Sequence, residues 1–143
     1  MISVTNMTME DFKSIEPILT TDFDDFWNPE TLKSELLNKD YSCFVAKNNI
    51  GEILGFANIW NTVDDIHITN IVVRKISRKQ GIGTLLLKKL IEISNKPLTL
   101  EVKHTNIPAI KFYSKHGFKN VGIRKSYYDN THDAIIMTRE RYK

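Results

Sequence analysis

The spacing of hydrophobic residues changes along the chain, and each change indicates a different kind of secondary structure. Helix-like spacing covers residues 9–19 after Thr8, and again residues 29–37 after Asn28. Thr and Asn side chains accept hydrogen bonds from the free N–H groups at the start of a helix. A proline at the first helical position, as at Pro29, interrupts no hydrogen bond. We therefore expect two helices in this part of the chain.

Strand-like runs follow these helices. Residues 43–46, 53–60 and 66–73 are rich in β-branched and aromatic side chains. Residues 48–51, between the first two runs, favour a short hairpin connection. The third run begins with alternating polarity and ends in a continuous apolar stretch, so we expect that end of the strand to be covered on both faces.

The second half of the chain continues with both kinds of element. Over residues 82–93 apolar residues recur every three or four positions, which is the spacing of one helical face. The remaining elements are expected at residues 98–102, 106–116, 118–123 and 134–138, in the order strand, helix, strand, strand. Gly117 is placed to end the second of these helices. The order predicts an α+β fold and a single domain over residues 1–143. In this fold about four helices flank a mixed, mostly antiparallel sheet of about six to seven strands.

Composition narrows the class of protein. Of the 143 residues, 41% are hydrophobic and 26% are charged, which is ordinary for a globular domain. Neither a long apolar run nor the pattern of a signal peptide occurs, so we expect no membrane partner. The single cysteine, Cys43, suits a reducing compartment, and a cytoplasmic location is expected. The net charge of +3 comes without the basic stripe typical of a nucleic-acid binder.

A glycine-containing turn follows the third expected strand and leads into a helix. Its residues are Arg78, Lys79, Gln80, Gly81, Ile82 and Gly83. The first N–H groups of a helix have no partner within it, and glycine lets a bulky phosphate group approach them. A Walker loop would need a Lys and a Ser or Thr after the second glycine, and a dinucleotide-binding loop would need a third glycine where Leu86 stands. A phosphate site of another type and a turn without a ligand both remain possible at this point.

This turn resembles the acyl-CoA loop, Gln/Arg-x-x-Gly-x-Gly/Ala, of the GNAT family of N-acetyltransferases. The resemblance implies the GNAT fold and acetyl-CoA as the cosubstrate. It also implies that the backbone of the preceding strand holds the pantetheine arm and that the turn, with the next residue, holds the pyrophosphate. The cofactor-binding residues that it implies here are Ile71, Val72, Val73, Arg78, Lys79, Gln80, Gly81, Ile82, Gly83 and Thr84.

A second segment strengthens the resemblance. Asn106 stands at a helix start, Ala109 three residues later, Tyr113 seven residues later, and Gly117 with Phe118 at the end. Seven helical residues make nearly two turns, so the first and third of these residues share a face, about 10 Å apart. The segment is similar to the second CoA segment of the family, which implies that Asn106 is a further cofactor anchor.

The resemblance narrows to one subfamily. Leu100-Glu101-Val102, Arg124-Lys125-Ser126-Tyr127-Tyr128 and Asp133-Ala134-Ile135-Ile136-Met137 are similar to sequences of the ribosomal-protein-alanine N-acetyltransferases, the RimI type. This implies that Glu101 is the general base, that Tyr113 protonates the leaving sulfur, and that a backbone N–H near Val73 stabilises the oxyanion. It also implies that the acceptor is the N-terminal amine of a ribosomal protein.

The implied roles of Glu101 and Tyr113 agree with their chemistry, and each residue also has a structural alternative. Glu101 alternates with two apolar neighbours and so points to the other face of its strand, into a cleft or onto the surface. Tyr113 has a phenol whose ordinary pKa of about 10 lies above that of a thiol, about 8.5, so the proton transfer is slightly uphill. Its alternative is an aromatic packed in the core. The four histidines show no metal spacing and Cys43 has no partner for a nucleophile, which favours direct transfer.

The sequence leaves the acceptor substrate open. Phe26 and Trp27 stand where the family has a Phe-Pro-Trp-Ser-like acceptor loop, and this sequence departs from that pattern. Tyr127 and Tyr128 are candidates for the wall of a peptide channel, or are ordinary strand aromatics. Two other functions therefore remain open: acetylation of a small amine such as a polyamine or an amino sugar, and binding of acyl-CoA without catalysis.

Overall fold

The structure is a computed structural model that describes residues 1–23, 28–128 and 132–141, and only the backbone of residues 126–128. The strands follow the order β1-β2-β3-β4-β5-β7-β6, which confirms the predicted α+β class and mixed, mostly antiparallel sheet. The chain forms two compact units, residues 1–61 with 68–93 and residues 62–67 with 94–143. The expected single domain stays a prediction, and each unit is described by itself.

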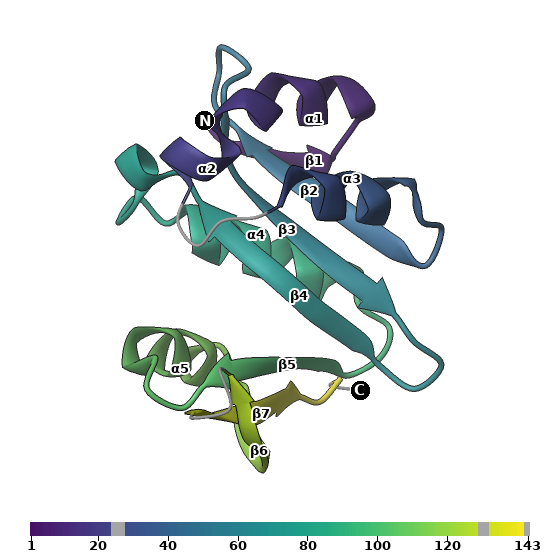
Figure 1. The fold of residues 1–143 in the computed structure, drawn as a ribbon, viewed down its shortest axis with the longest axis vertical. Coiled ribbons are helices and arrows are strands. Elements are labelled where there is room, and N and C mark those ends of the chain that lie inside the picture. The colour runs from purple at the N-terminus through teal and green to yellow at the C-terminus, as the bar shows by residue number, and fades with distance from the viewer. Residues whose placement is uncertain (24–27, 129–131, 142–143) are drawn as a thin grey trace. The chain divides into compact units, whose positions relative to one another are not determined.

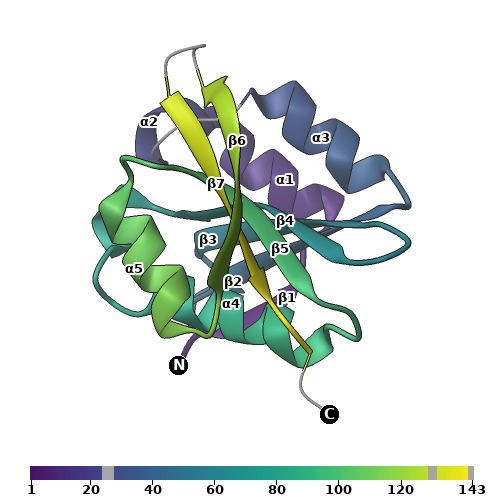
Figure 2. The same ribbon diagram turned by 90° about the horizontal axis from the view of Figure 1, so that it is seen from below.

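The first unit contains two layers of helices around four strands. Its elements are β1 (Ser3–Asn6), α1 (Met9–Ile15), α2 (Leu19–Asp22), α3 (Pro29–Leu37), β2 (Tyr41–Lys47), β3 (Ile53–Asn61), β4 (Ile66–Val73) and α4 (Ile82–Ile93), with 3₁₀ turns at Glu16–Ile18 and Lys75–Ser77. Helices α1, α2 and α3 cover one face of these strands and α4 covers the other (Figures 1 and 2). The first two residues of β4 belong to the second unit.

One prediction in this unit needs correction, and one strand was not predicted. The helix expected over residues 9–19 ends at Ile15, because Pro17 cannot donate a backbone hydrogen bond and the chain continues as a 3₁₀ turn. Strand β1 (Ser3–Asn6) has no sequence signal, since it pairs with β2 on one side only and its residues are largely exposed. The predicted bounds of α3, β4 and α4 are confirmed.

Local hydrogen bonds explain why α1 begins where it does. The Asp11 backbone N–H donates to the Thr8 hydroxyl at 3.1 Å, and the Thr8 N–H donates to the Asp11 carboxylate at 2.9 Å. This reciprocal arrangement is a capping box. The Lys47 ammonium lies 2.8 Å from the same carboxylate, which ties α1 to β2.

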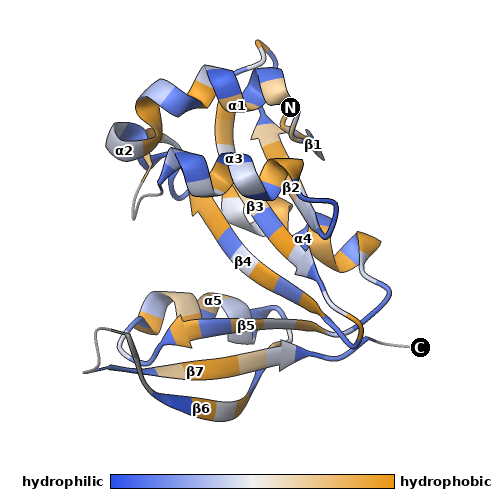
Figure 3. Cartoon of the chain, turned by 45° about the vertical axis from the view of Figure 1, so that its right-hand side comes forward, coloured by the Kyte–Doolittle hydropathy of each residue, from blue (hydrophilic) through white to orange (hydrophobic). Residues whose placement is uncertain are grey.

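The hydrophobic core of the first unit lies between α1–α3 and the strands. Figure 3 shows apolar residues concentrated on β2, β3 and β4, with mixed polarity on the helices. The buried cluster comprises Met7, Phe12, Ile15, Leu19, Phe23, Leu32, Cys43, Val45, Ile53, Phe56 and Val72. On the opposite face α4 approaches β3 at Gly55, where an added Cβ would lie 3.1 Å from Ile82 and 3.3 Å from Leu86. The close packing of α4 therefore depends on that glycine.

The second unit is built on antiparallel strands and one helix. Its elements are β5 (Leu98–Lys103), α5 (Ile107–Lys115), β6 (Lys119–Tyr128) and β7 (His132–Arg139), with β7 paired to both β5 and β6. The start of β4 pairs with β5 in parallel, through Ile66 with Leu98 and His67 with Thr99. Helix α5 begins at the Asn106 cap, as predicted, and ends before Gly117, whose φ is 90°. Within the described ranges, each helix is too short or too polar to cross a membrane.

Candidate active site

The turn between β4 and α4 has the backbone shape of an anion site. The Arg74 N–H donates to the Leu54 carbonyl at 2.8 Å, which fixes the end of β4 against β3. Beyond the 3₁₀ turn, Lys79 and Gly81 both have left-handed backbones, with φ of 63° and 80°. Turns that include left-handed residues can direct successive N–H groups toward an anion.

Helix α4 begins directly after this turn. The Leu85 N–H donates to the Gly81 carbonyl at 3.0 Å, and that bond is the first of the helix. The N–H groups just before it have no carbonyl partner within the helix, and the helix dipole favours a negative charge there. Arg78, Lys79, Gln80 and Gly81 are exposed, Gly83 and Thr84 are half-buried, and Ile82 is buried. The turn thus offers charge and backbone donors, while Ile82 anchors it in the core.

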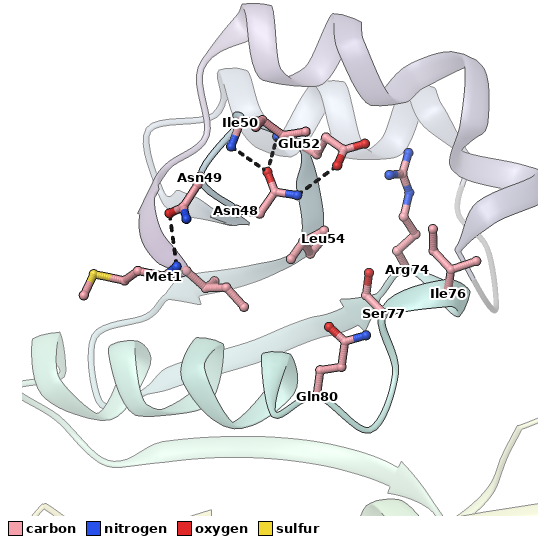
Figure 4. A pocket seen from close by; sticks show the side chains of 11 residues that line it. Met1, Asn48, Asn49, Ile50, Glu52, Leu54, Arg74, Ile76, Ser77 and Gln80 are labelled. Carbon is pink, nitrogen blue, oxygen red and sulfur yellow. Dashed lines mark hydrogen bonds between the residues drawn. The ribbon is translucent and has the colours of Figure 1, made fainter.

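A pocket lies beside the same turn. It has a volume of about 510 Å³, and Figure 4 shows Gln80, Ser77 and Arg74 on one side and the hairpin residues Asn48 and Glu52 on the other. Asn48 is held within the hairpin, because its side chain accepts from the Ile50 and Glu52 N–H groups and donates to the Glu52 carboxylate. The sequence analysis did not predict this pocket, since its two sides are distant in the chain.

The strand before the turn presents alternating side chains. Ile71 and Val73 are half-buried, and Val72 is buried at 7% exposure. The implied role of these residues uses their backbone and stays a prediction.

Glu101 lies in the middle of β5 in the second unit. Its neighbours Leu100 and Val102 are buried on one face, and its own side chain is 12% exposed on the other. Its carboxylate oxygens face two basic side chains: Oε2 lies 3.1 Å from the Arg124 Nε, and Oε1 lies 4.0 Å from the His67 Nε2. The alternative of a surface carboxylate is therefore wrong, and the strand places Glu101 in a polar cluster.

Tyr113 lies on α5 among aromatic rings. Its ring packs edge-on against Phe112 and Phe118, with centroid distances of 5.1 and 5.4 Å. Burial raises the pKa of the Tyr113 phenol to about 12. The phenol therefore stays protonated over the working pH range of an enzyme, as a proton donor must. Because the ordinary pKa of a thiol is about 8.5, donation from this phenol to a thiolate is more uphill than donation from a phenol of ordinary pKa, about 10.

Asn106 has a structural role that is visible in the fold. Its side-chain oxygen accepts from the Ala109 N–H at 3.2 Å and so caps α5. The side chain is exposed at the start of the helix that carries Tyr113. Its role as a cofactor anchor stays a prediction.

The remaining predicted residues concern the acceptor and the nucleophile. Phe26 and Trp27 lie outside the described residues, as do the side chains of Tyr127 and Tyr128. Cys43 is buried, and burial together with the charge of Glu35 raises the pKa of its thiol to about 12. This thiol is therefore a poor nucleophile.

The sequence did not predict that His67 or Arg124 lies beside Glu101. Each reaches Glu101 from a strand that is distant in the chain, β4 in one case and β6 in the other. For Arg124, the only signal was its place as the first residue of the motif Arg124-Lys125-Ser126-Tyr127-Tyr128.

Comparisons with known proteins show the family of this chain. The sequence profile of the acetyltransferase (GNAT) family matches residues 7–118. A relative from Bacillus subtilis (strain 168), provisionally named a ribosomal protein bS18-alanine N-acetyltransferase, is 35% identical over 94% of this chain and 93% of its own length. The bS18-alanine N-acetyltransferase of Escherichia coli (strain K12) is 35% identical over 78% of each chain. The crystal structure of the ribosomal-protein-S18-alanine N-acetyltransferase from Escherichia coli superposes with a TM-score of 0.87 at 29% identity. That match covers 100% of this chain and 96% of the other.

Proposed function

We propose that this chain, which belongs to the acetyltransferase (GNAT) family and is an N-acetyltransferase, transfers the acetyl group of acetyl-CoA to the N-terminal α-amine of a ribosomal protein. The observation that carries the chemistry is Glu101, a carboxylate that is 12% exposed on β5. The similarity to bS18-alanine N-acetyltransferases over most of the chain supports the choice of acceptor.

An α-amine suits a carboxylate base. With a pKa near 8, about one α-amine in ten is neutral at pH 7, against about one lysine amine in 2,500. Removal of the proton from an N-terminal ammonium therefore needs only a weak general base. A carboxylate that acts directly or through one water is sufficient. A lysine acceptor would need a site that lowers the pKa of its amine.

The proposed reaction uses two side chains of the second unit. Glu101 removes a proton from the acceptor ammonium, and the neutral amine then attacks the thioester carbonyl carbon. The C–N bond forms, the tetrahedral intermediate collapses, and the C–S bond breaks. The departing sulfur takes the phenolic proton of Tyr113, whose raised pKa keeps that proton in place until then. The attacking nitrogen loses its second proton as the amide forms, and that proton returns the Tyr113 phenolate to the phenol.

The turn of the first unit supplies binding rather than chemistry in this proposal. Arg78 and Lys79 carry positive charge, and the N-terminal N–H groups of α4 add donors for the pyrophosphate of acetyl-CoA. Contacts with the pyrophosphate hold the cofactor in place and take no part in bond breaking.

A panel of acceptors tests the proposal. The wild-type protein is mixed with acetyl-CoA and hexapeptides that begin with Ala, Ser or Met, and release of the CoA thiol is followed. We expect turnover with an Ala-initial peptide and an added mass of one acetyl group on its first residue. The matched control is the same peptide with a blocked N-terminus and one internal lysine, which we expect to stay unmodified. Turnover of spermidine or an amino sugar with no turnover of any peptide would contradict the proposed acceptor.

A further inference from the structure

Strand register places Arg124 on the same face of the second unit as Glu101. Glu101 of β5 pairs with Ile136 of β7, and Ile136 pairs with Gly122 of β6. Directly paired residues have side chains on one face of a sheet, as do residues two apart in a strand. Arg124, two residues after Gly122 and paired with Ala134, therefore shares the face of Glu101 and must reach it across β7.

A small residue of β7 lies beside this path. Ala134, which pairs with Arg124, is fully buried and carries a single methyl group. The Arg124 Nε lies 3.1 Å from Oε2 of Glu101, the distance of a charge-assisted contact. The contact is an ion pair, in which the guanidinium charge attracts that oxygen and favours one orientation of the carboxylate.

His67 approaches the other oxygen of Glu101. It pairs with Thr99, two residues before Glu101, so its side chain lies on the same face. The His67 Nε2 is 4.0 Å from Oε1. This exceeds a direct hydrogen bond, so a proton moves between these two atoms only through a water that bridges them. The His67 side chain is 24% exposed against 12% for Glu101, so the imidazole is the more solvent-accessible of the two.

We propose that His67 carries to solvent the proton that Glu101 removes from the acceptor, while Arg124 holds Glu101 with Oε1 toward His67. The inference rests on the proposed function, because it takes Glu101 as the base. An N–H bond of the ammonium breaks and its proton passes to Oε1. The carboxylic acid then gives the proton, through the bridging water, to a ring nitrogen of His67. The imidazole releases a proton to solvent, and Glu101 is left as a carboxylate for the next cycle. Both residues act through Glu101. Arg124 is a positioning residue, and His67 relays the proton.

Chemical rescue tests the relay. In the full chain, His67→Ala should lower kcat about tenfold or more, with the melting temperature and the affinity for CoA unchanged. Millimolar imidazole added to this variant should restore turnover in proportion to its concentration, which a merely structural histidine would not allow. His67→Gln keeps the size and polarity of the side chain but carries no proton, and should stay slow. Full turnover of His67→Ala, or a slow variant that imidazole does not restore, overturns the relay.

Two further variants separate this inference from the proposed function. Glu101→Gln should be slow with or without imidazole; if it keeps wild-type turnover, the proposed role of Glu101 fails whatever His67 does. Arg124→Gln should lower kcat with the KM for acetyl-CoA unchanged, and Arg124→Lys should recover part of the loss. Lys125→Gln, on a side chain that is 83% exposed, is the matched control. Wild-type kcat in Arg124→Gln overturns the positioning role.

Discussion

Gly55 of β3 faces the backbone carbonyl of Val72 in β4 so closely that a Cβ on Gly55 would lie 2.7 Å from that oxygen. Real Cβ atoms do not occupy such positions, and the obstacle is backbone, which cannot rotate away. Val72 belongs to the strand that we expect to hold the pantetheine arm. The glycine therefore links the packing of the first unit to the shape of the proposed acetyl-CoA site.

Gly55→Ala should destabilise the protein by about 1–3 kcal/mol, because an extra methyl group in a close-packed site forces β3, β4 or α4 to move. Urea unfolding with two spectroscopic probes measures the change. Gly122→Ala is the matched control, since its added Cβ would meet only the Ile136 side chain, at an ordinary 3.6 Å. Equal stability of the two variants would show that the strands adjust without cost.

Glu101→Gln should lower kcat by about 10²–10⁴-fold, the usual contribution of a general base. The amide keeps the size of the side chain but takes up no proton. We expect the dissociation constant for CoA to stay within a factor of about two, because Glu101 contributes chemistry and not cofactor affinity. Thiol release gives the rate and calorimetry the affinity. Glu140→Gln, at an exposed position, should behave as the wild type. A proportional loss of rate and of CoA affinity would point to a folding defect instead.

Tyr113→Phe should lower kcat by about 10²-fold or more, since the ring packing on Phe112 and Phe118 is retained and only the proton donor is lost. Burial raises the pKa of this phenol to about 12. A group that acts in its protonated form loses activity as pH rises through its pKa. Ionisation of Tyr113 should therefore not reduce the wild-type rate below about pH 10. Tyr41→Phe, on a half-buried ring that stacks on Trp60, is the control and should leave kcat unchanged. An unchanged kcat in Tyr113→Phe removes the proposed proton donor.

Much of this architecture follows from local sequence signals. The ends of α3 and α4, the Asn106 cap and the Gly117 stop were predicted because each depends on residues within one or two turns. Strand β1 was not predicted, since its pairing with β2 is set by tertiary structure and its four residues are mostly polar and exposed. Pro17 ended a helix that hydrophobic spacing alone would have extended.

In the candidate site, too, local features could be predicted from the sequence and long-range contacts could not. Alternation along β5 predicted which face Glu101 occupies, because a strand has a fixed period of two. The partners of Glu101 could not be predicted, since His67 and Arg124 meet it through the registers of three other strands. Register depends on packing over the whole unit, which no short motif encodes.

The charge and the backbone of the phosphate turn can be tested separately. Lys79 has a φ of 63°, where a non-glycine residue costs about 1 kcal/mol, so Lys79→Gly removes the ammonium and keeps the conformation. This variant should bind CoA several-fold more weakly, with a smaller salt dependence and no loss of stability. Gly81→Ala keeps every charge but strains a φ of 80°, so it should bind CoA more weakly and keep the salt dependence of the wild type. Thermal shifts at a series of CoA and salt concentrations distinguish the two. Identical salt dependence in both variants would remove the ionic role of Lys79.

Asp11 should make the stability of the first unit dependent on acid. Burial opposes its ionisation, but hydrogen bonds from Lys47 and from Thr8 outweigh burial and lower the pKa of the Asp11 carboxyl below its ordinary value. A carboxyl with a lower pKa in the folded state stabilises the protein above its unfolded pKa, and that contribution is lost as pH falls through the folded value. Asp11→Asn should therefore cost about 1–2 kcal/mol at pH 7, and the difference from the wild type should shrink below about pH 4.

Urea unfolding at several pH values measures this difference. Glu10→Gln, at an exposed position in the same helical turn, is the matched control and should change little at any pH. Lys47→Met should reproduce part of the Asp11→Asn effect at neutral pH, because it removes the ammonium that lies 2.8 Å from the carboxylate. If Asp11→Asn lost the same stability at pH 3 as at pH 7, the cap would act through shape and hydrogen bonding alone, and its charge would contribute nothing.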